Sequence, residues 1–442
     1  MASTYLTRTP STAGNRRTGT FSAWVKRGSL GTLNSLLDCY TSFELTWFNI
    51  RFSATDQIQA IAYDQTSGFQ EQFELRPTRL FRDTSAWYHI VFSWDSTQAT
   101  ASDRVKFYVN GELETSFSIS NYPALDEDFY INYNSIPYWI GRGGWNSNYF
   151  NGSMSYVAFV DGTAELPTIF GETDSVTGQW KIKTDITPSV AWGTNGFLIL
   201  KNGNSLTDES TNSNNFTLGA GTLTNTLDCP SNVFATLNPL VKTYGTQVFS
   251  NGNTTSLNAT NEPAWAHAIA TLGASTGKYY WEIKVSGSTP WIWTGIISEA
   301  VDVSTQYLYN SNAGTFLYGN NGNKYVNASA TSSFFATLAT NDIVSVALNL
   351  DDNKITFYKN GTATPNATPL DLPTNLSSTT VFPATTIVNG ASIQSNFGNG
   401  YFGTTAVTTN SGNGYAGAEG ASKFNYQPPT GYSALTTKGL NA

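Results

Sequence analysis

The chain contains the pattern Phe-Tyr-x-Asn-Gly twice, at residues 107–111 and 357–361. Asn-Gly after an alternating apolar row is the strongest short-range signal for a two-residue β-hairpin, because both turn positions accept a positive φ. Val105, Phe107 and Val109 form such a row before the first turn, and the second copy repeats it less strictly. Each half of the chain is therefore expected to contain an antiparallel strand that turns back on itself.

Composition favours β-sandwiches over helical bundles. Aromatic residues make up 14% of the 442 residues and charged residues only 12%, and there are 38 glycines. No apolar spacing of helical period persists for three turns, and a chain of this length exceeds one typical core. We therefore predict an all-β fold of two tandem antiparallel β-sandwiches.

Charge and hydropathy argue against several classes of protein. A net charge of −8 leaves no basic stripe for nucleic acid. No apolar run approaches the roughly 20 residues of a membrane-spanning helix, and the first residues contain no apolar signal-peptide region. Cys39 and Cys229 are the two cysteines and are interpreted as free thiols. We expect a protein made in a reducing cytoplasm that neither enters a membrane nor binds nucleic acid.

Changes in composition divide the chain into four parts. Residues 1–205 alternate short strand patterns with polar turns and are predicted to form the first sandwich. Residues 206–240 are polar and poor in large apolar side chains, so we interpret them as a connector. Residues 241–403 return to the strand pattern and are predicted to form the second sandwich. Residues 404–442 contain consecutive prolines that forbid a helix, and are expected to form an extended arm lying on that sandwich.

Longer motifs carry a resemblance to two known families. The first half contains, in order, TFSAWVKR, WYHIVFSWD, VKFYVNGE and WIGRGGWNSNYFNGSMSYVAFVDG, and it resembles a laminin-G/concanavalin-A-like domain. The second half contains GKYYWEIKV, NDIVSVALNLDDNKITFYKNG and ASIQSNFG, and it is similar to a SPRY domain. The resemblance implies a jelly-roll sandwich followed by a SPRY-like sandwich.

The pairing of these domains, with STNSNNFTL and DCPSNVFATLNPL between them, resembles structural proteins of tailed bacteriophages. The resemblance implies a virion protein that is assembled in the host cytoplasm. Its expected partners are other virion proteins of the tail or capsid, together with a host surface polysaccharide or receptor. Fibres of this kind are homo-oligomers, often trimers.

The residues do not indicate an enzyme. Laminin-G-like folds also host glycoside hydrolases, but no E-x-D-x-x-E string is present. The nearest acidic groups, Glu71 with Glu74 and the run 126–128, are interpreted as solvated charges. His89 and His267 lack sequence partners for a zinc site or a catalytic triad. We therefore predict no catalytic residue.

No metal or cofactor site is predicted. Laminin-G-like folds often bind calcium at the sandwich rim, where Asp38, Asp161 or the pair Asp351 and Asp352 could supply oxygen ligands. No D-x-[DN]-x-[DN]-G loop supports calcium binding. Calcium therefore stays an unsupported alternative.

Exposed aromatic residues in loops are the predicted ligand-binding groups. Trp145 and Tyr149 lie in the Gly/Asn-rich stretch GRGGWNSNYFNG, and Trp291 and Trp293 lie in STPWIWTG at an expected loop-to-strand junction. Large aromatic side chains give much contact area at a low entropy cost. Packing against the sandwich rim or a neighbouring subunit is the structural alternative for each of them.

The leading prediction is a non-enzymatic bacteriophage virion protein, a tail-fibre or adhesin component for host-surface recognition. A capsid head-decoration or head-fibre protein is the alternative within the same class. A polysaccharide-degrading virion enzyme is the alternative from a different class. A soluble cellular SPRY adaptor fits least, because the first half and the connector do not suit it.

Overall fold

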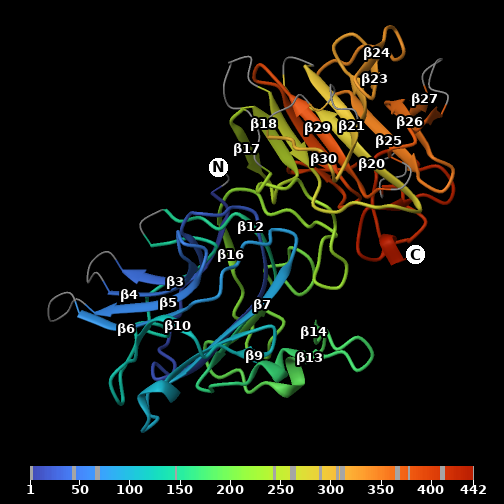
Figure 1. Cartoon of the computed structure of the whole chain (residues 1–442). Coiled ribbons are helices and arrows are strands. Elements are labelled where there is room, and N and C mark those ends of the chain that lie inside the picture. The colour runs from blue at the N-terminus through green and yellow to red at the C-terminus, as the bar shows by residue number, and fades with distance from the viewer. Residues whose placement is uncertain are drawn as a thin grey trace. The chain divides into compact units, whose positions relative to one another are not determined.

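The structure is a computed structural model that divides into two units, Met1–Asn225 and Thr226–Ala442, each built from antiparallel sheets (Figure 1). It describes residues 3–41, 46–64, 70–144, 147–241, 245–258, 265–287, 291–304, 308, 314–363, 369–376, 379–408 and 414–441. The all-β prediction is confirmed, since the helices of the described part are short 3-10 turns. They are η1 (Ala101–Asp103), η2 (Pro167–Ile169), η3 (Thr187–Ser189) and η5 (Gly439–Asn441).

The first unit is a sandwich of an eight-stranded and a six-stranded sheet, with a small two-stranded sheet beside them. The larger sheet has the order β10 (Phe117–Asn121), β6 (Gln70–Pro77), β5 (Ile58–Asp64), β4 (Thr46–Phe52), β3 (Asn34–Thr41), β11 (Tyr138–Ile140), β1 (Tyr5–Arg8), β16 (Thr217–Ala220). The smaller has the order β15 (Phe197–Ile199), β12 (Gly152–Asp161), β2 (Thr18–Arg27), β7 (Trp87–Asp95), β8 (Val105–Val109), β9 (Glu112–Leu113), and the small sheet pairs β13 (Gly171–Thr173) with β14 (Trp180–Ile182).

Aromatic rings from both large sheets fill the core of the first unit. Phe92 of β7 lies with its ring centroid 5.8 Å from Phe73 of β6 and 6.3 Å from Phe48 of β4. These side chains are fully buried, and each is worth about 1.5–3 kcal/mol in removed apolar surface. The alternation in these strands sends one row of side chains inward and leaves the other row on the outer face of each sheet.

The second unit has the same two-layer design. Its larger sheet has the order β17 (Gln247–Ser250), β18 (Thr255–Asn258), β30 (Ser392–Asn396), β20 (Lys278–Val285), β25 (Ile343–Asn349), β26 (Lys354–Lys359), β27 (Thr362–Ala363), with β28 (Leu370–Asp371) on β26 and β33 (Ser433–Ala434) on β20. The smaller sheet has the order β19 (Ala266–Ile269), β29 (Val381–Ile387), β21 (Ile292–Ser298), β22 (Gly314–Tyr318), β23 (Lys324–Val326), β24 (Ser329–Thr331), and β31 (Tyr401–Phe402) pairs with β32 (Thr405–Ala406).

The two Phe-Tyr-x-Asn-Gly motifs form the same hairpin, one in each unit. Asn110 and Asn360 both have a φ of 49°, as a type I′ turn requires. Each asparagine exchanges two hydrogen bonds with the neighbouring strand: Asn110 with His89, at 2.8 and 2.9 Å, and Asn360 with Ile343, both at 2.9 Å. The repeated motif therefore marks the same local structure twice.

A histidine between two tryptophans covers the outer face of the six-stranded sheet in the first unit. The His89 ring stacks on Trp24 at 4.8 Å and under Trp180 of β14 at 5.9 Å. Trp180 Nε1 donates to His89 Nδ1 at 2.9 Å, so His89 Nε2 carries the proton and donates to Ser22 Oγ at 2.9 Å. Burial lowers the pKa of His89 to about 3. The histidine is thus a neutral structural group.

The polar residues after β15 fold onto the first unit through side-chain hydrogen bonds. Asp208 accepts hydrogen bonds from the main-chain N–H of Leu198 at 2.8 Å and of Asn214 at 2.7 Å. β16, a few residues later, pairs with β1. Part of the polar stretch expected as a connector therefore takes part in the first unit.

The last residues of the chain lie against the larger sheet of the second unit. The buried carboxylate of Glu282 in β20 accepts the main-chain N–H of Asn425 and of Tyr426, both at 2.8 Å. Farther along, Ala235 N–H donates to Leu435 O at 3.0 Å. The first and the last segments of this unit are therefore held side by side.

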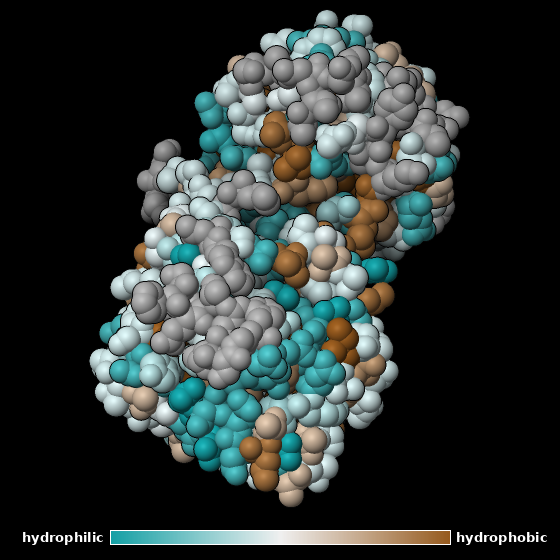
Figure 2. Space-filling model, turned by 90° about the vertical axis from the view of Figure 1, so that its left-hand side faces the viewer, coloured by the Kyte–Doolittle hydropathy of each residue, from teal (hydrophilic) through white to brown (hydrophobic). Residues whose placement is uncertain are grey.

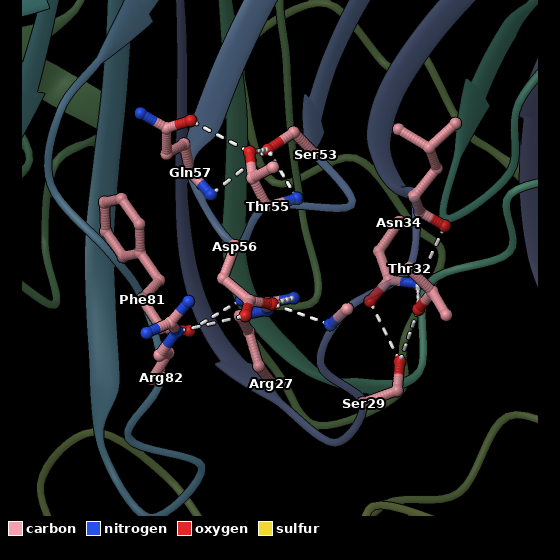
Figure 3. A network of polar contacts seen from close by, with 12 residues as sticks. Arg27, Ser29, Thr32, Asn34, Ser53, Thr55, Asp56, Gln57, Phe81 and Arg82 are labelled. Carbon is pink, nitrogen blue, oxygen red and sulfur yellow. Dashed lines mark hydrogen bonds and ion pairs between the residues drawn. The ribbon is translucent and has the colours of Figure 1, made fainter. Parts of the chain in front are cut away.

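A buried ion pair joins three loops at one end of the first sandwich (Figure 3). Arg27 has a fully buried side chain, and its Nη2 lies 3.0 Å from Asp56 Oδ1. Asp56 also accepts the N–H of Gly31 at 2.8 Å and contacts the exposed Arg82 at 3.3 Å. Arg27 Nη1 donates to Phe81 O at 2.6 Å. One carboxylate therefore fixes the ends of several strands.

We predict that Asp56→Asn destabilises the first unit by about 3 kcal/mol, because it leaves the Arg27 charge buried without a counter-charge. Asparagine tolerates the φ of 66° at this position. Pulse proteolysis of the full chain in urea, with fragments of the first unit identified by mass, measures the change.

Arg82→Ala is the matched control for this substitution. It removes the exposed partner of the same carboxylate and is expected to cost less than about 1 kcal/mol. Equal losses of stability in the two variants would show that the buried Arg27–Asp56 pair contributes no more than the exposed Arg82–Asp56 pair.

Candidate functional site

The four aromatic residues predicted from the sequence have different surroundings. Trp145 lies outside the described residues. Tyr149 is half-buried, and its ring centroid lies 6.3 Å from that of Tyr5. Trp291 precedes β21 and is 36% exposed. Tyr149 and Trp291 are therefore placed where a ligand can reach part of each ring.

Trp293 has a different position from the one expected. It belongs to β21, is only 3% exposed, and stacks on Tyr318 of β22 with ring centroids 3.8 Å apart. A third ring, Trp265, lies 4.5 Å from it. Trp293 packs on the outer face of the smaller sheet, where Tyr318 and Trp265 cover its ring.

The aspartates named as calcium ligands accept hydrogen bonds from nitrogen donors. Asp161 accepts the N–H of Asn15 at 2.7 Å and of Asn195 at 2.9 Å, and Asp351 accepts the N–H of Gly277 at 2.8 Å. Within the described ranges, no three or more His, Cys, Asp or Glu side chains form a group that could hold a metal ion. These contacts tie loops together.

The outer face of the eight-stranded sheet carries a row of aromatic side chains, which we call the aromatic belt: Tyr63, Trp47, Tyr40, Trp139 and Tyr5. Tyr40 and Trp47 are only 5% and 8% exposed, whereas the other three are half-buried. Trp47 stacks on Tyr63 at 5.8 Å and faces Tyr40 across β3 and β4. Tyr40 lies 6.3 Å from Trp139. The belt crosses β5, β4, β3, β11 and β1, a distance of roughly 19 Å at the spacing of paired strands.

Two arginines stack on the belt. The Arg51 guanidinium lies 4.7 Å from the Trp47 ring centroid. The Arg142 guanidinium lies 4.6 Å from Tyr5 and 4.5 Å from Trp139. Cation–π contacts of this kind attract the cation to the ring face and fix the plane of the guanidinium. The belt therefore combines flat apolar surfaces with oriented N–H donors.

A buried carboxyl group lies beneath the belt. Asp38 is 0% exposed, and its Oδ2 accepts from Trp47 Nε1 at 2.8 Å and from Asn49 Nδ2 at 2.6 Å. Burial raises the pKa of Asp38 to about 7, although these hydrogen bonds and one from the Gly144 N–H oppose the rise. The group fixes the indole of Trp47 and holds the loop after β11 over the sheet.

The carboxylates of Asp38 and Glu74 on this face are too far apart for a glycosidase pair. The register Asp38↔Asn49, Asn49↔Ile61 and Ile61↔Glu74 places the two carboxylates three strands apart, roughly 14 Å between Cα atoms. Retaining and inverting glycosidases need separations of about 5 and 6.5–9.5 Å respectively. Glu74 is also occupied, since it accepts from Gln59 Nε2 at 2.6 Å.

The sequence contained a signal for the belt that loop aromatics alone do not give. In TWFNIRF, the buried core residues Phe48, Ile50 and Phe52 alternate with Trp47, Asn49 and Arg51. This alternation assigns the second set to the outer face. The neighbours of each ring depend on strand register, which hydropathy does not fix.

Two family comparisons match separate parts of the chain. Residues 2–169 match the concanavalin A-like lectin/glucanases superfamily, and residues 278–400 match the SPRY domain. The chain carries a concanavalin A-like domain followed by a SPRY domain. The aromatic belt belongs to the concanavalin A-like domain, and Trp291 and Trp293 belong to the SPRY domain.

Solved structures similar to the chain include SPRY domains. The SPRY domain of human HERC1 is 15% identical, with a TM-score of 0.29, over 34% of this chain and 91% of its own. The TRIM65 PSpry domain is 14% identical, with a TM-score of 0.29, over 36% and 88%. A human SPRY domain is 16% identical, with a TM-score of 0.28, over 34% and 93%. No curated protein sequence matched the chain.

We predict that the stability of the concanavalin A-like domain relative to its Asp38→Asn variant falls by about 2–3 kcal/mol between pH 5 and pH 7.5. The comparison with the variant is needed because His89, whose pKa burial lowers to about 3, gives an opposing rise of about 2 kcal/mol in both proteins over the same range. The folded state keeps a proton on Asp38 that the unfolded chain loses near pH 4, so raising the pH favours unfolding until about pH 7. Pulse proteolysis in urea at both pH values measures the difference. The same pH dependence in the wild type and in the variant would assign it to groups other than Asp38.

Proposed function

We propose that this protein is a non-enzymatic bacteriophage virion protein, a tail-fibre or adhesin component that binds a polysaccharide on the host surface. The aromatic belt is the observation that carries the proposal. Sugar rings present flat apolar faces that stack on aromatic side chains, and their hydroxyl groups need fixed hydrogen-bonding partners. Tyr63, Trp139 and Tyr5 supply partly exposed rings, while Arg51 and Arg142 supply N–H groups on the same face.

The length of the belt favours a chain ligand over a single sugar. Its partly exposed rings lie at the two ends, Tyr63 on β5 at one end and Trp139, Tyr5 and the neighbouring Tyr149 at the other. On the face of the first unit shown in Figure 2, hydrophilic and neutral residues predominate and apolar residues form small islands. Such a surface suits a hydrated polymer better than a broad apolar protein interface.

A virion origin is supported by the order of the sequence motifs and by the tandem pairing of the two domains. A fibre component is expected to be a symmetric homo-oligomer, for which a trimer is the common state. The SPRY domain, with Trp291 partly exposed, offers a second surface for a virion or host protein.

We predict that Trp139→Ala weakens binding of the full-length protein to host cells at least tenfold, about 1.4 kcal/mol, because it removes the partly exposed ring on which Arg142 stacks. Soluble protein should block phage adsorption, and the variant should not. Pull-down with cells and an adsorption assay give the two measurements.

Tyr133→Ala is the matched control. Tyr133 is 39% exposed and also lies under an arginine, Arg16, but it is not part of the belt. Equal binding by the wild type and both variants would contradict the proposal. Release of reducing sugar from the host polysaccharide would favour a polysaccharide-degrading enzyme.

Position on the particle tests the virion role directly. Antibody-labelled virions viewed by electron microscopy are expected to carry the label on the tail. Label on the head, together with binding to empty heads and not to cells, would favour the decoration role. Light scattering of the purified protein is expected to show a homo-oligomer.

A further inference from the structure

Arg142 has the least satisfied guanidinium of the described arginines. Its one hydrogen bond among these residues is a long contact of 3.5 Å from Nη2 to Gly144 O, and its Nε is buried without a partner. Other arginines donate to carboxylates or to main-chain and amide oxygens at shorter distances, as do Arg16, Arg17, Arg27, Arg51, Arg76, Arg79 and Arg104. A cation without a counter-charge is notable in a chain of net charge −8.

Carboxylates on the same sheet face do not neutralise Arg142. Asp38 lies beneath the belt and binds Trp47 and Asn49, while Glu74 binds Gln59 and pairs with Arg76 at 2.5 Å. No salt bridge joins Arg142 to any carboxylate in the described part of the chain. Its charge is therefore available to a group from outside.

The two rings also restrict how such a group can approach. Tyr5 and Trp139 lie against the guanidinium within 4.6 Å, so an incoming anion meets its N–H edge. Because Nε is buried, the edge left for a carboxylate is the planar fork formed by Nη1 and Nη2, which can donate two parallel hydrogen bonds to it. Sugar rings stacked on the neighbouring aromatics would bring a carboxylate substituent into the plane of the fork.

We propose that the ligand of the aromatic belt is an acidic polysaccharide, whose uronate carboxylates bind Arg142 while the sugar rings stack on Trp139 and Tyr5. This inference rests on the proposed function and narrows it to one class of polymer. Arg51, stacked on Trp47 farther along the belt, supplies a second positive charge for the same chain.

The test compares uronate polymers with the same polymers after reduction of their carboxyl groups to alcohols. Full-length protein is titrated by calorimetry with alginate, polygalacturonate and hyaluronan, each in both forms, at low salt. At least one acidic polymer should bind tenfold or more tightly than its reduced form. The preference should shrink at high salt, because exposed charges are screened.

Variants of Arg142 separate the contribution of its positive charge from that of its planar guanidinium group. Arg142→Gln should abolish the preference for the acidic form and leave weak binding of the reduced polymer. Arg142→Lys, which keeps the charge without the planar fork, should retain only part of the preference. Arg79→Gln, an arginine outside the belt, should bind as the wild type does. Urea denaturation confirms that each variant is folded.

Three results would overturn the inference: equal binding of acidic and reduced polymers, a preference that survives in Arg142→Gln, or no binding of any of the three acidic polymers. Cell binding that depends on Trp139 would in each case leave the proposed function standing. Cell binding that does not depend on Trp139 would contradict the proposed function and this inference together.

Discussion

Burial of alternate side chains between two antiparallel sheets is the constraint on which each unit depends. In β2 the inward residues Phe21 and Val25 are buried, and so is the outward Trp24. A sheet with apolar residues on both faces needs a cover on its outer side as well. Trp180 from the small β13–β14 sheet supplies that cover through its stack on His89.

The second unit solves the same problem with a different segment. Tyr280 of β20 points outward and is buried under Phe424, with the two rings 4.8 Å apart and nearly perpendicular. The chain near Phe424 is held by Glu282 through main-chain N–H groups. In both units, residues beyond the sandwich therefore act as a further packing layer.

The fold could be read from the sequence because its signals are local. Strand alternation in β2 and β7 indicates which side chains face the core. The Asn-Gly turns indicate where a strand folds back to pair with the next one. The polar stretch around Asp208 could not be read in this way. Its order comes from side-chain hydrogen bonds to main-chain N–H groups, and hydropathy does not record such bonds.

The residues of the candidate site also divide into those that a local sequence pattern predicts and those that it does not. Tyr149 is predicted because a large aromatic residue in a Gly/Asn loop has no local packing role, and Trp291 because it lies at an expected loop-to-strand junction. Trp47 and Trp139 lie within strands, where a ring is normally assigned to packing, so they gave no separate signal. Their place in the aromatic belt depends on strand register, which brings rings from distant segments next to one another and next to arginines.

The pairing of residues near Ala235 with residues near Leu435 has an evolutionary consequence. Because these two segments of the second unit lie side by side, the unit can be inserted into, or exchanged between, other proteins with little distortion of the recipient. Recombination between genes can therefore transfer the unit as a whole, and the binding specificity of a protein can change without changes in its other domains.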